Sequence, residues 1–327
     1  MEASLTSMPV DILDTIFQDF NYQEILNLRL INREFNNYVT TFKPDFRLKY
    51  ITVTAITSGF VISFGENREQ WKSKNHLKSV MCVEGDDDMW GPLDTILGHQ
   101  KSILDYFELK CSLEENERGY IKLLEKMETV LPTLPRKLPV KKLSLEAKTQ
   151  DQVLGVLPHL DSAHLRTIEF TDFVTHALQE TRPRNTMETD QIIELDQWKM
   201  AKKFSAERMV FDARITDFDH FDDVRIDLDT FKMSELKEWK ENLCRGTSRK
   251  TVNISCHQLI EDDELPNNYT VTQGPFDGHE TYCYRIPNSP DAVLRISKYG
   301  RNGSARFELD RFRSELVELV QRLRFEW

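Results

Sequence analysis

The sequence lacks any long run of apolar residues. No stretch approaches the ~20 uninterrupted apolar residues that a membrane-spanning helix requires. The segment from Met1 to Asp14 also lacks the charged start and the apolar run of a secretory signal peptide. We therefore expect a cytoplasmic or nuclear chain without a membrane partner.

Cysteines are few, and they lack a metal-binding arrangement. The five cysteines are Cys82, Cys111, Cys244, Cys256 and Cys283, and no two of them are spaced as C-x-x-C. This spacing provides neither a zinc knuckle nor a disulfide framework. We expect most of these side chains to be small buried hydrophobic groups, and we expect the protein to need no cofactor or metal.

Recognisable catalytic motifs are also missing. None of the eight histidines belongs to an H-E-x-x-H pair, and the sequence contains neither a Walker A loop nor a G-x-S-x-G elbow. These absences do not exclude an enzyme, because a catalytic triad can be assembled from residues that are distant in sequence. They favour a protein without catalytic activity, and we assign no catalytic residue.

Positive charge is in deficit as well. The 327 residues include 43 Lys and Arg against 54 Asp and Glu, which gives a formal net charge of −11. Such a balance disfavours a partner coated with phosphates, so we do not expect nucleic acid to bind, although a local basic patch remains compatible with it.

Two features that suggest sites are interpreted as structural. The segment 217–223 holds four carboxylates and an imidazole, but it lacks the glycine and the trailing glutamate of a calcium loop. We predict a solvated turn whose Phe218 and Phe221 point inward. Tryptophans on helices with apolar neighbours are usually core residues, so we predict the same for Trp90, Trp198 and Trp239.

What the sequence does contain suits a folded protein of more than one unit. Hydrophobic residues make up 39% of the chain and charged residues 30%, which is ordinary for a globular protein. A domain usually has about 100–200 residues. We therefore expect two units, or a small module followed by an elongated one.

The first fifty residues carry apolar side chains at helical spacing. Pro9 suits a first helical position, and Asn21 with Glu24 resembles the cap of a second helix. A third helix would end before Lys43 and Pro44. The apolar positions of the three predicted helices are Ile12, Leu13, Ile16, Phe17 and Phe20, then Ile25, Leu26 and Leu28, and then Ile31, Phe35, Tyr38 and Val39. Three helices in ~40 residues cannot bury so many large side chains among themselves, so the rest of the chain or a partner must cover them.

This stretch follows the pattern L-x-x-[LM]-P-x-[DE]-I-L-x-x-I-F and then I-L-x-L-R-x-I-N-R-x-F, which resembles the F-box. The matching positions are Leu5, Met8, Pro9, Asp11, Ile12, Leu13, Ile16, Phe17, Ile25, Leu26, Leu28, Arg29, Ile31, Asn32, Arg33 and Phe35. Met8 stands where leucine is usual, and the tryptophan that often follows the third helix is absent. An ordinary three-helix cap on a larger domain is the alternative interpretation.

F-box proteins dock on the Skp-family adaptor of cullin-based ubiquitin ligases. The resemblance therefore implies that residues 1–48 bind such an adaptor and, through it, a cullin scaffold. The implied adaptor-binding residues are Leu5, Met8, Pro9, Ile12, Leu13, Ile16, Phe17, Ile25, Leu26, Leu28, Ile31 and Phe35. Arg29 and Arg33 are compatible both with such a contact and with solvated charges.

From Tyr50 the pattern changes from helical to extended. The apolar runs 51–54 and 60–64 are separated by Ser58 and Gly59, which predicts a hairpin. Further strands are predicted at 104–109, 140–145, 165–170, 208–211, 224–228 and 252–256, and helices at 116–131, 151–160, 189–204 and 234–243. A strand followed by a helix, repeated about every 17–40 residues, indicates βα units in a parallel sheet. Because each short unit buries its apolar side only against its neighbours, we expect an irregular solenoid, with a generic α/β or α+β fold as the alternative.

After Pro266 the apolar residues alternate as in antiparallel strands. We predict strands at 269–272, 280–286, 293–296 and 305–309 and a closing helix over 314–324, which together cap the open end of the solenoid. The predicted fold class is α+β. It comprises a helical module over 1–48, a β-rich connecting segment over 49–100, an α/β repeat domain over 101–265, and antiparallel strands with a C-terminal helix over 266–327.

Three segments of the repeat region resemble the FTH domain, which follows the F-box in a large nematode family. The segments are 140–145, 195–202 and 215–221, and the most distinctive piece is L-x-Q-W-K, from Leu195 to Lys199. The resemblance implies a leucine-rich-repeat-like recognition domain that has no enzyme activity of its own.

Alternation along the strands predicts which side chains the sheet leaves uncovered. Leu143 and Leu145 point to one face, so Lys142, Ser144 and Glu146 point to the other. The same alternation exposes Thr167, Glu169, Arg225, Asp227, Asp229, Asn253 and Ser255. We predict that this mixed-charge face binds a protein target through Lys142, Ser144, Thr167, Glu169, Arg225 and Asp227, with a merely solvated face as the alternative.

Two functions are compatible with these observations. The first is that of a substrate receptor, in which the F-box joins the ligase and the following domain holds a protein target. The second is a ligase-independent scaffold that binds protein or nucleic acid, and the net charge of −11 disfavours the nucleic-acid version.

Overall fold

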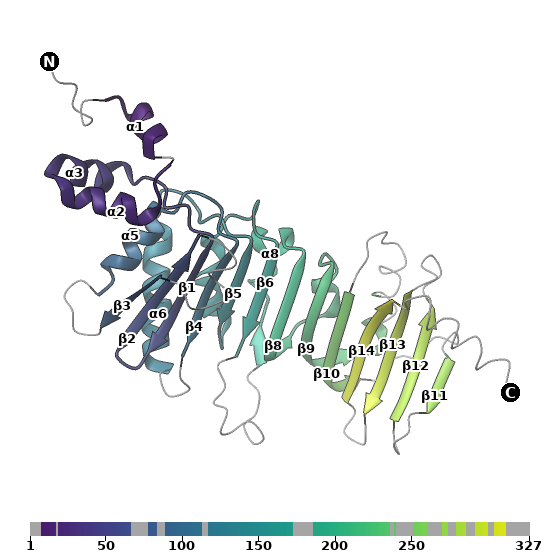
Figure 1. Ribbon diagram of the computed structural model, residues 1–327. Helices are drawn as coiled ribbons and strands as arrows, with labels where there is room; N and C mark the ends of the chain where they lie inside the picture. The colour runs from purple at the N-terminus through teal and green to yellow at the C-terminus, as the bar shows by residue number, and fades with distance from the viewer. Residues whose placement is uncertain are drawn as a thin grey trace. The chain divides into compact units, whose positions relative to one another are not determined.

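The computed structural model describes residues 8–17, 19–66, 78–83, 89–112, 117–172, 186–235, 239, 251–260, 270–273, 279–285, 292–299 and 304–311. These residues form a mixed α/β fold of open sheet and helices (Figure 1). The chain divides into two compact units. The first unit comprises residues 1–146 and 151–166, and the second comprises residues 147–150 and 167–327. The four-part division expected from the sequence stays a prediction.

Three short helices open the first unit, as the sequence predicts. They are α1 (Val10–Phe17), α2 (Tyr22–Ile31) and α3 (Arg33–Phe42), and we call them the helical module. Asn21 caps α2, because its Oδ1 accepts hydrogen bonds from the backbone N of Gln23 (2.9 Å) and Glu24 (3.1 Å). The Glu24 carboxylate accepts in return from the backbone N of Asn21 at 2.7 Å. α3 ends at Lys43, whose left-handed φ of 46° terminates the helix before Pro44.

The sheet of the first unit begins with the predicted hairpin. β1 (Tyr50–Ile56) and β2 (Gly59–Gly65) are antiparallel, and Gly59 adopts a φ of 140° that only glycine reaches readily. β3 (Lys78–Val83), which we did not predict, pairs antiparallel with β2. β4 (Tyr106–Cys111) pairs parallel with β1, and β5 (Lys142–Glu146) pairs parallel with β4. The parallel βα arrangement is therefore confirmed for these strands.

Helices cover one face of this sheet (Figure 1). α6 (Glu117–Val130) matches the predicted helix at 116–131, and the Tyr120 hydroxyl shares its single hydrogen between the carbonyl oxygens of Leu109 (3.0 Å) and Glu146 (2.6 Å). α5 (Gly91–His99) was not predicted. The helix expected at 151–160 is divided into α7 (Gln150–Leu154) and the 3-10 turn η3 (Leu157–His159), and another 3-10 turn, η2 (Leu131–Thr133), follows α6.

The second unit begins with parallel strands and continues with antiparallel ones. β6 (Thr167–Thr171), β8 (Lys203–Asp212), β9 (Asp223–Lys232) and β10 (Thr251–Ile260) pair in parallel in that order, and the short β7 (Thr186–Glu188) pairs with β8. The predicted antiparallel strands are confirmed as β11 (Thr270–Gln273), β12 (His279–Arg285), β13 (Ala292–Tyr299) and β14 (Ser304–Arg311). β14 pairs with β10, so these strands extend the same sheet. The expected helix at 314–324 lies outside the described residues.

The helix predicted at 189–204 is wrong over most of its length. Only α8 (Asp196–Met200) is α-helical, and β8 begins at Lys203. The side chain of Gln150 contacts the segment that precedes α8, although the two are distant in sequence. Its Nε2 donates to Asp190 Oδ1 at 2.7 Å, and its Oε1 accepts from the backbone N of Gln191 at 3.0 Å. This buried amide satisfies backbone that a longer helix would otherwise satisfy. The helix predicted at 234–243 lies mostly outside the described residues.

An aromatic core holds the second unit together. Trp198 is 1% exposed, and its ring lies 4.7 Å from Phe204, 4.9 Å from Phe221 and 5.6 Å from Phe218 between ring centroids. The 3-10 turn η5 (Ile215–Phe218) positions Phe218, and the carboxylate of Asp217 accepts from the backbone N of Arg214 at 3.0 Å. The predictions of a buried Trp198 and of inward Phe218 and Phe221 are therefore confirmed. Trp239 is also buried, and Trp90 is half-buried, stacked on Phe60.

Candidate functional site

The helical module carries large apolar side chains that the described part of the chain does not cover. Leu30 is 84% exposed, Ile31 63%, Ile12 50% and Phe42 41%. Leu30 and Ile31 are neighbours at the end of α2. Fully burying one such side chain stabilises a complex by about 1.5–3 kcal/mol. The sequence predicts that the rest of the chain or a partner covers these apolar residues, and Leu30 and Ile31 are the side chains of the module that the described residues leave most exposed.

Other apolar residues of the module are buried within the protein itself. Leu13, Phe17 and Ile25 are at most 3% exposed, and the ring of Phe17 stacks on Tyr38 with centroids 5.0 Å apart. These three were predicted to touch an adaptor. In the described conformation they instead hold the helices together.

The remaining predicted adaptor residues vary in exposure. Pro9 is exposed like Ile12 and Ile31, whereas Leu5 lies outside the described residues. The half-buried members are Met8, Ile16, Leu26, Leu28 and Phe35. Leu30 is not among the predicted adaptor residues, although its position on the helix indicates that it is exposed. At about 100° per residue, Leu30 lies roughly 140° around α2 from the buried Ile25, off the apolar stripe.

The helical module is anchored to the sheet of its own unit. The ring of Tyr22 meets Phe64 of β2 edge-on at 4.9 Å between centroids, and the Lys78 ammonium of β3 lies 4.6 Å from the Tyr22 ring centroid. Within the module, Arg29 Nε donates to Asn36 Oδ1 at 3.1 Å, which joins α2 to α3. Arg29 thus has a structural contact, and the module is held in a fixed orientation on this sheet.

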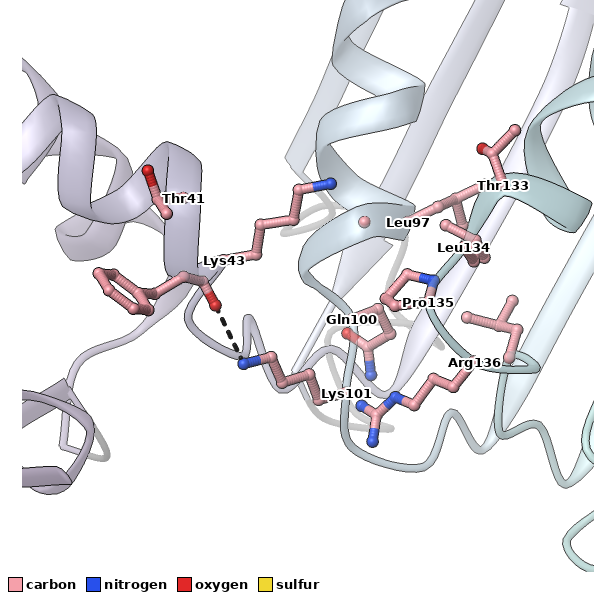
Figure 2. Close-up of a pocket in the computed structure, with 12 residues that line it drawn as sticks. Thr41, Lys43, Leu97, Gln100, Lys101, Thr133, Leu134, Pro135 and Arg136 are labelled. Atoms are coloured by element: carbon pink, nitrogen blue, oxygen red, sulfur yellow. Dashed lines mark hydrogen bonds between the residues drawn. The ribbon is translucent and has the colours of Figure 1, made fainter. Parts of the chain in front are cut away.

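A pocket lies where α3 ends. It has a volume of about 550 Å³ and is bordered by the end of α3, the end of α5 and the segment after η2 (Figure 2). Three cationic side chains, Lys43, Lys101 and Arg136, line it together with apolar groups such as Leu97 and Leu134. No motif in the sequence marks this pocket, because its lining residues come from three distant segments.

A buried histidine lies beside this pocket. The Nδ1 of His99 donates to the carbonyl oxygen of Pro44 at 2.9 Å, and the imidazole stacks on Phe46 with centroids 4.3 Å apart. Burial lowers the pKa of His99 to about 4, against the opposing effect of the Pro44 hydrogen bond. The positive charges of Lys43, Arg29 and Lys101 lower this pKa further. His99 is therefore a neutral group at physiological pH.

The first testable prediction concerns acid stability. Because the pKa of His99 is 6.5 when unperturbed and about 4 in the folded protein, the unfolded chain binds the extra proton in that pH range. The free energy of unfolding should fall by about 2–3 kcal/mol through this group as the pH is lowered from 7 to 4. Urea denaturation at a series of pH values measures the decrease. His99→Asn keeps a donor toward Pro44 but does not titrate, so its decrease should be smaller by that amount. An identical pH dependence in both proteins would contradict the prediction.

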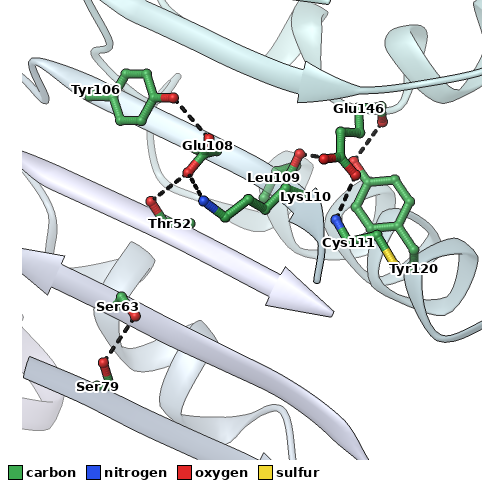
Figure 3. A network of polar contacts seen from close by, with 10 residues as sticks. All are labelled: Thr52, Ser63, Ser79, Tyr106, Glu108, Leu109, Lys110, Cys111, Tyr120 and Glu146. Atoms are coloured by element: carbon green, nitrogen blue, oxygen red, sulfur yellow. Dashed lines mark hydrogen bonds and ion pairs between the residues drawn. The ribbon is translucent and has the colours of Figure 1, made fainter. Parts of the chain in front are cut away.

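The face of the first sheet opposite α6 carries a row of polar side chains. Pairing aligns Ser79, Ser63, Thr52, Glu108 and Ser144 across the five strands. Figure 3 shows the contacts within this row and beside it. The Glu108 carboxylate accepts hydrogen bonds from Thr52 Oγ1 (3.0 Å) and the Tyr106 hydroxyl (2.9 Å), and it pairs with the Lys110 ammonium at 2.7 Å. Ser63 and Ser79 share a hydrogen bond of 2.9 Å.

Lys142 and Ser144 lie on this polar face, as predicted. Leu143 and Leu145 are fully buried, while Lys142, Ser144 and Glu146 are half-buried. The Lys142 ammonium lies 5.3 Å from the centroid of the Tyr106 ring, and the Glu146 carboxylate accepts from the backbone N of Cys111 at 2.6 Å. A ring contact and a hydrogen bond thus hold Lys142 and Glu146 in defined positions.

The second unit carries its own mixed-charge face. Glu169, Ser205, Arg225 and Asn253 are aligned on successive strands, and Asp227 is aligned with Ser255. The buried partners of the alternation are Ile168, Phe170, Val224, Ile226, Leu228, Val252 and Ile254. The predicted orientation of Thr167, Glu169, Arg225 and Asp227 is therefore confirmed, with Arg225 and Asp229 the exposed members.

The charges on this face are loosely paired. The Arg225 side chain is 66% exposed, and its Nε lies 3.9 Å from Asp223 Oδ1. The Lys203 ammonium lies 3.8 Å from the other oxygen of the same carboxylate. Exposed pairs at these distances contribute little to stability.

The described residues include neither a cluster of metal-binding side chains nor a membrane-spanning helix. Within the described residues, no group of three or more His, Cys, Asp and Glu side chains is arranged to hold a metal ion. Among the helices that the structure describes, none is long and apolar enough to cross a membrane.

Comparison with known families identifies one domain. Residues 121–266, just under half of the chain, match the family model of the FTH domain, which supports an FTH-family protein. The match begins within α6 and includes the L-x-Q-W-K segment whose tryptophan is the buried Trp198. Neither a curated protein nor a solved structure matches the sequence.

Proposed function

We propose that this chain is the substrate-recognition subunit of a cullin-based ubiquitin ligase. Residues 1–48, which contain the helical module, are the F-box that binds the Skp-family adaptor, and the domain that follows binds a protein target. The observation that carries this proposal is the exposure of Leu30 and Ile31 at the end of α2, in a module anchored to the unit that leads into the FTH match. Adjacent exposed apolar side chains such as Leu30 and Ile31 are typical of a surface that a permanent partner covers.

The mechanism is one of proximity. The receptor performs no chemistry itself, and it uses no cofactor or metal. It holds a target beside the active thioester of another subunit, which raises the effective concentration of the target lysines. The ligase operates in the cytoplasm or the nucleus, where such an adaptor and cullin would be available.

Adaptor binding by the purified full-length chain tests the proposal directly. The chain and a recombinant Skp-family adaptor are mixed and analysed by size-exclusion chromatography with light scattering and by isothermal titration calorimetry. We expect a stoichiometric complex with a negative heat-capacity change, because apolar surface is buried on binding. A chain that is folded and monomeric but forms no complex with any adaptor paralogue would refute the ligase function.

Target binding is assigned to the polar faces described above. We propose that the parallel strands belong to an irregular leucine-rich-repeat-like solenoid, in which the face opposite the helices is the recognition surface. Ordered polar networks such as that of Glu108, together with loosely paired charges such as Arg225, provide complementary groups for a protein partner.

A charge-reversal variant tests this assignment. Lys142→Glu, Glu169→Lys, Arg225→Glu and Asp227→Lys together leave the net charge unchanged, so only the arrangement of charges differs. We expect adaptor binding to stay close to that of the wild type and the melting temperature to fall only modestly, because these side chains lie on the uncovered faces of the sheets and not in the core, although only Arg225 is exposed. Quantitative mass spectrometry of co-purified proteins should show that the target is lost.

The control variant reverses exposed charges on α6 instead. Arg118→Glu, Lys122→Glu, Glu125→Lys and Glu128→Lys also conserve net charge, and they lie on the opposite side of the first sheet. This variant should retain the target. Retention of every co-purified protein by the first variant would place the target site elsewhere.

A further inference from the structure

The pocket at the end of α3 has positively charged walls in a strongly acidic chain. Lys43, Lys101 and Arg136 line it, and no carboxylate does. The chain as a whole has a formal net charge of −11. In the part of the chain that the structure describes, none of these three cations forms an ion pair. The pocket is therefore a locally positive site in a protein whose net charge is negative.

The C-terminal ends of two helices offset only part of the positive charge of the pocket. The Lys101 ammonium donates to the carbonyl oxygen of Phe42 at the end of α3 (3.2 Å), as Figure 2 shows. Lys43 extends toward the end of α5, and its Nζ lies 3.3 Å from the position that a β-carbon on Gly98 would take. Each helix C-terminus carries about half a negative charge, so the two ends offset about one of the three positive charges.

The neighbouring carboxylate of Asp45 does not remove the remainder. Its Oδ1 accepts hydrogen bonds from the backbone N of Lys101 (2.8 Å) and Arg47 (3.1 Å), it does not line the pocket, and its single negative charge is smaller than the remainder of about two positive charges. Burial is the largest cause of the lowered pKa of His99, and the nearby positive charges of Lys43, Arg29 and Lys101 lower it further. An excess of positive charge therefore remains at the pocket.

The walls also contain apolar surface. Phe42, Leu97, Leu134 and Leu138 line the pocket beside the cations, and Phe42 is one of the exposed large side chains of the helical module. A volume of about 550 Å³ is within the range of sites that hold several side chains or a drug-sized ligand, and it exceeds the size of a single small anion. Anionic and apolar groups in one short segment would match both kinds of wall.

We infer that this pocket binds an acidic peptide segment of a protein partner. Carboxylates of the segment pair with Lys43, Lys101 and Arg136, and an apolar side chain of the segment packs on Phe42 and Leu134. A short peptide fits better than a nucleic acid, because a long polyanion would extend from the pocket onto a surface of net negative charge and be repelled there. The inference rests on the pocket alone and holds whether or not the helical module binds an adaptor.

Fluorescence anisotropy with the full-length chain tests this inference. The probe is a fluorescein-labelled peptide of alternating glutamate and leucine, and its matched partner has glutamine in place of every glutamate. We expect the glutamate peptide to bind and the affinity to fall as salt is raised, because the contacts are ionic and partly exposed. Equal binding of the glutamine peptide would overturn the inference.

A triple variant locates the binding. Lys43→Ala, Lys101→Ala and Arg136→Ala together should weaken binding of the glutamate peptide about tenfold or more, since each exposed ionic contact contributes a modest share. The matched control removes one arginine and two lysines that are exposed and do not line the pocket, Arg118→Ala, Lys122→Ala and Lys202→Ala. The control should bind the peptide as the wild type does.

A second variant guards against loss of folding in the first. Arg136→Glu changes a single exposed side chain in the segment after η2, so the chain should fold, and its affinity for the glutamate peptide should fall severalfold. Unchanged binding by this folded variant and by a folded triple variant would overturn the inference. The inference would also be overturned if a single-stranded oligonucleotide bound the wild type through these cations and the glutamate peptide did not bind.

Discussion

Replacing Leu30 and Ile31 together by aspartate is expected to weaken binding to a Skp-family adaptor at least about a hundredfold. Each substitution removes about 1.5–3 kcal/mol of apolar burial in the complex and places a carboxylate in a desolvated interface. Both side chains are largely exposed in the free chain, so the substitutions should leave its fold intact. Calorimetry measures the affinity, and circular dichroism monitors the melting temperature.

The matched control places the same substitutions at other exposed apolar residues. Met81→Asp and Val83→Asp add the same charge on β3, where Met81 and Val83 are exposed and lie outside the helical module. This control should bind the adaptor as the wild type does. Leu13→Asp is unsuitable for the purpose, because Leu13 is buried within the protein and its loss would disrupt the module itself. Wild-type affinity in the Leu30 and Ile31 variant would place any adaptor contact elsewhere.

Replacing Trp198 by alanine is expected to lower the free energy of unfolding of the second unit by about 3–5 kcal/mol. The indole is packed among Phe204, Phe218 and Phe221, and its Nε1 donates to the carbonyl oxygen of Asp217 at 3.3 Å. Truncation leaves a large cavity among rings that are held by β8 and η5 and cannot collapse into it. Urea denaturation followed by circular dichroism measures the change.

Two further substitutions serve as comparisons for Trp198→Ala. Trp198→Phe keeps an aromatic ring but loses volume and the hydrogen bond, so it should destabilise the unit by a smaller amount, about 1–3 kcal/mol. Met200→Ala in the same helix changes a side chain that is half exposed, so its effect should stay within about 1 kcal/mol. A loss no larger in Trp198→Ala than in Met200→Ala would show that the aromatic core is not essential to the stability of the second unit.

Residues within or next to an element were sufficient to predict several of the helices and strands. The helices α2 and α3 have their own caps, Asn21 and Asn32, and the hairpin of β1 and β2 has glycine where a positive φ is required. α6 carries a complete apolar stripe that packs against the sheet. In each case the information lies within a few residues of the element, so reading the chain locally is enough.

Other elements depended on contacts that are distant in sequence. The turns at 190–195 are held by the side chain of Gln150, about forty residues earlier, so the apolar spacing there was misread as one long helix. β7 has only three residues and is defined by its pairing with β8. α5 begins without a side-chain cap, and His99 at its end contacts Pro44, which lies 55 residues earlier.

The sequence by itself determined most of the helices and strands, the parallel pairing of the strands that alternate with helices, and the face to which the side chains of β5, β6, β9 and β10 point. These properties follow from periods of 3.6 and 2 residues, which the backbone imposes locally. Only the tertiary structure decided which apolar side chains the protein covers itself. Leu13, Phe17 and Ile25 are buried, whereas Leu30 and Ile31 remain exposed. It alone also brought Lys43, Lys101 and Arg136 to one pocket. The physical reason is that burial and electrostatic potential are summed over neighbours in space, and most of those neighbours are far apart along the chain.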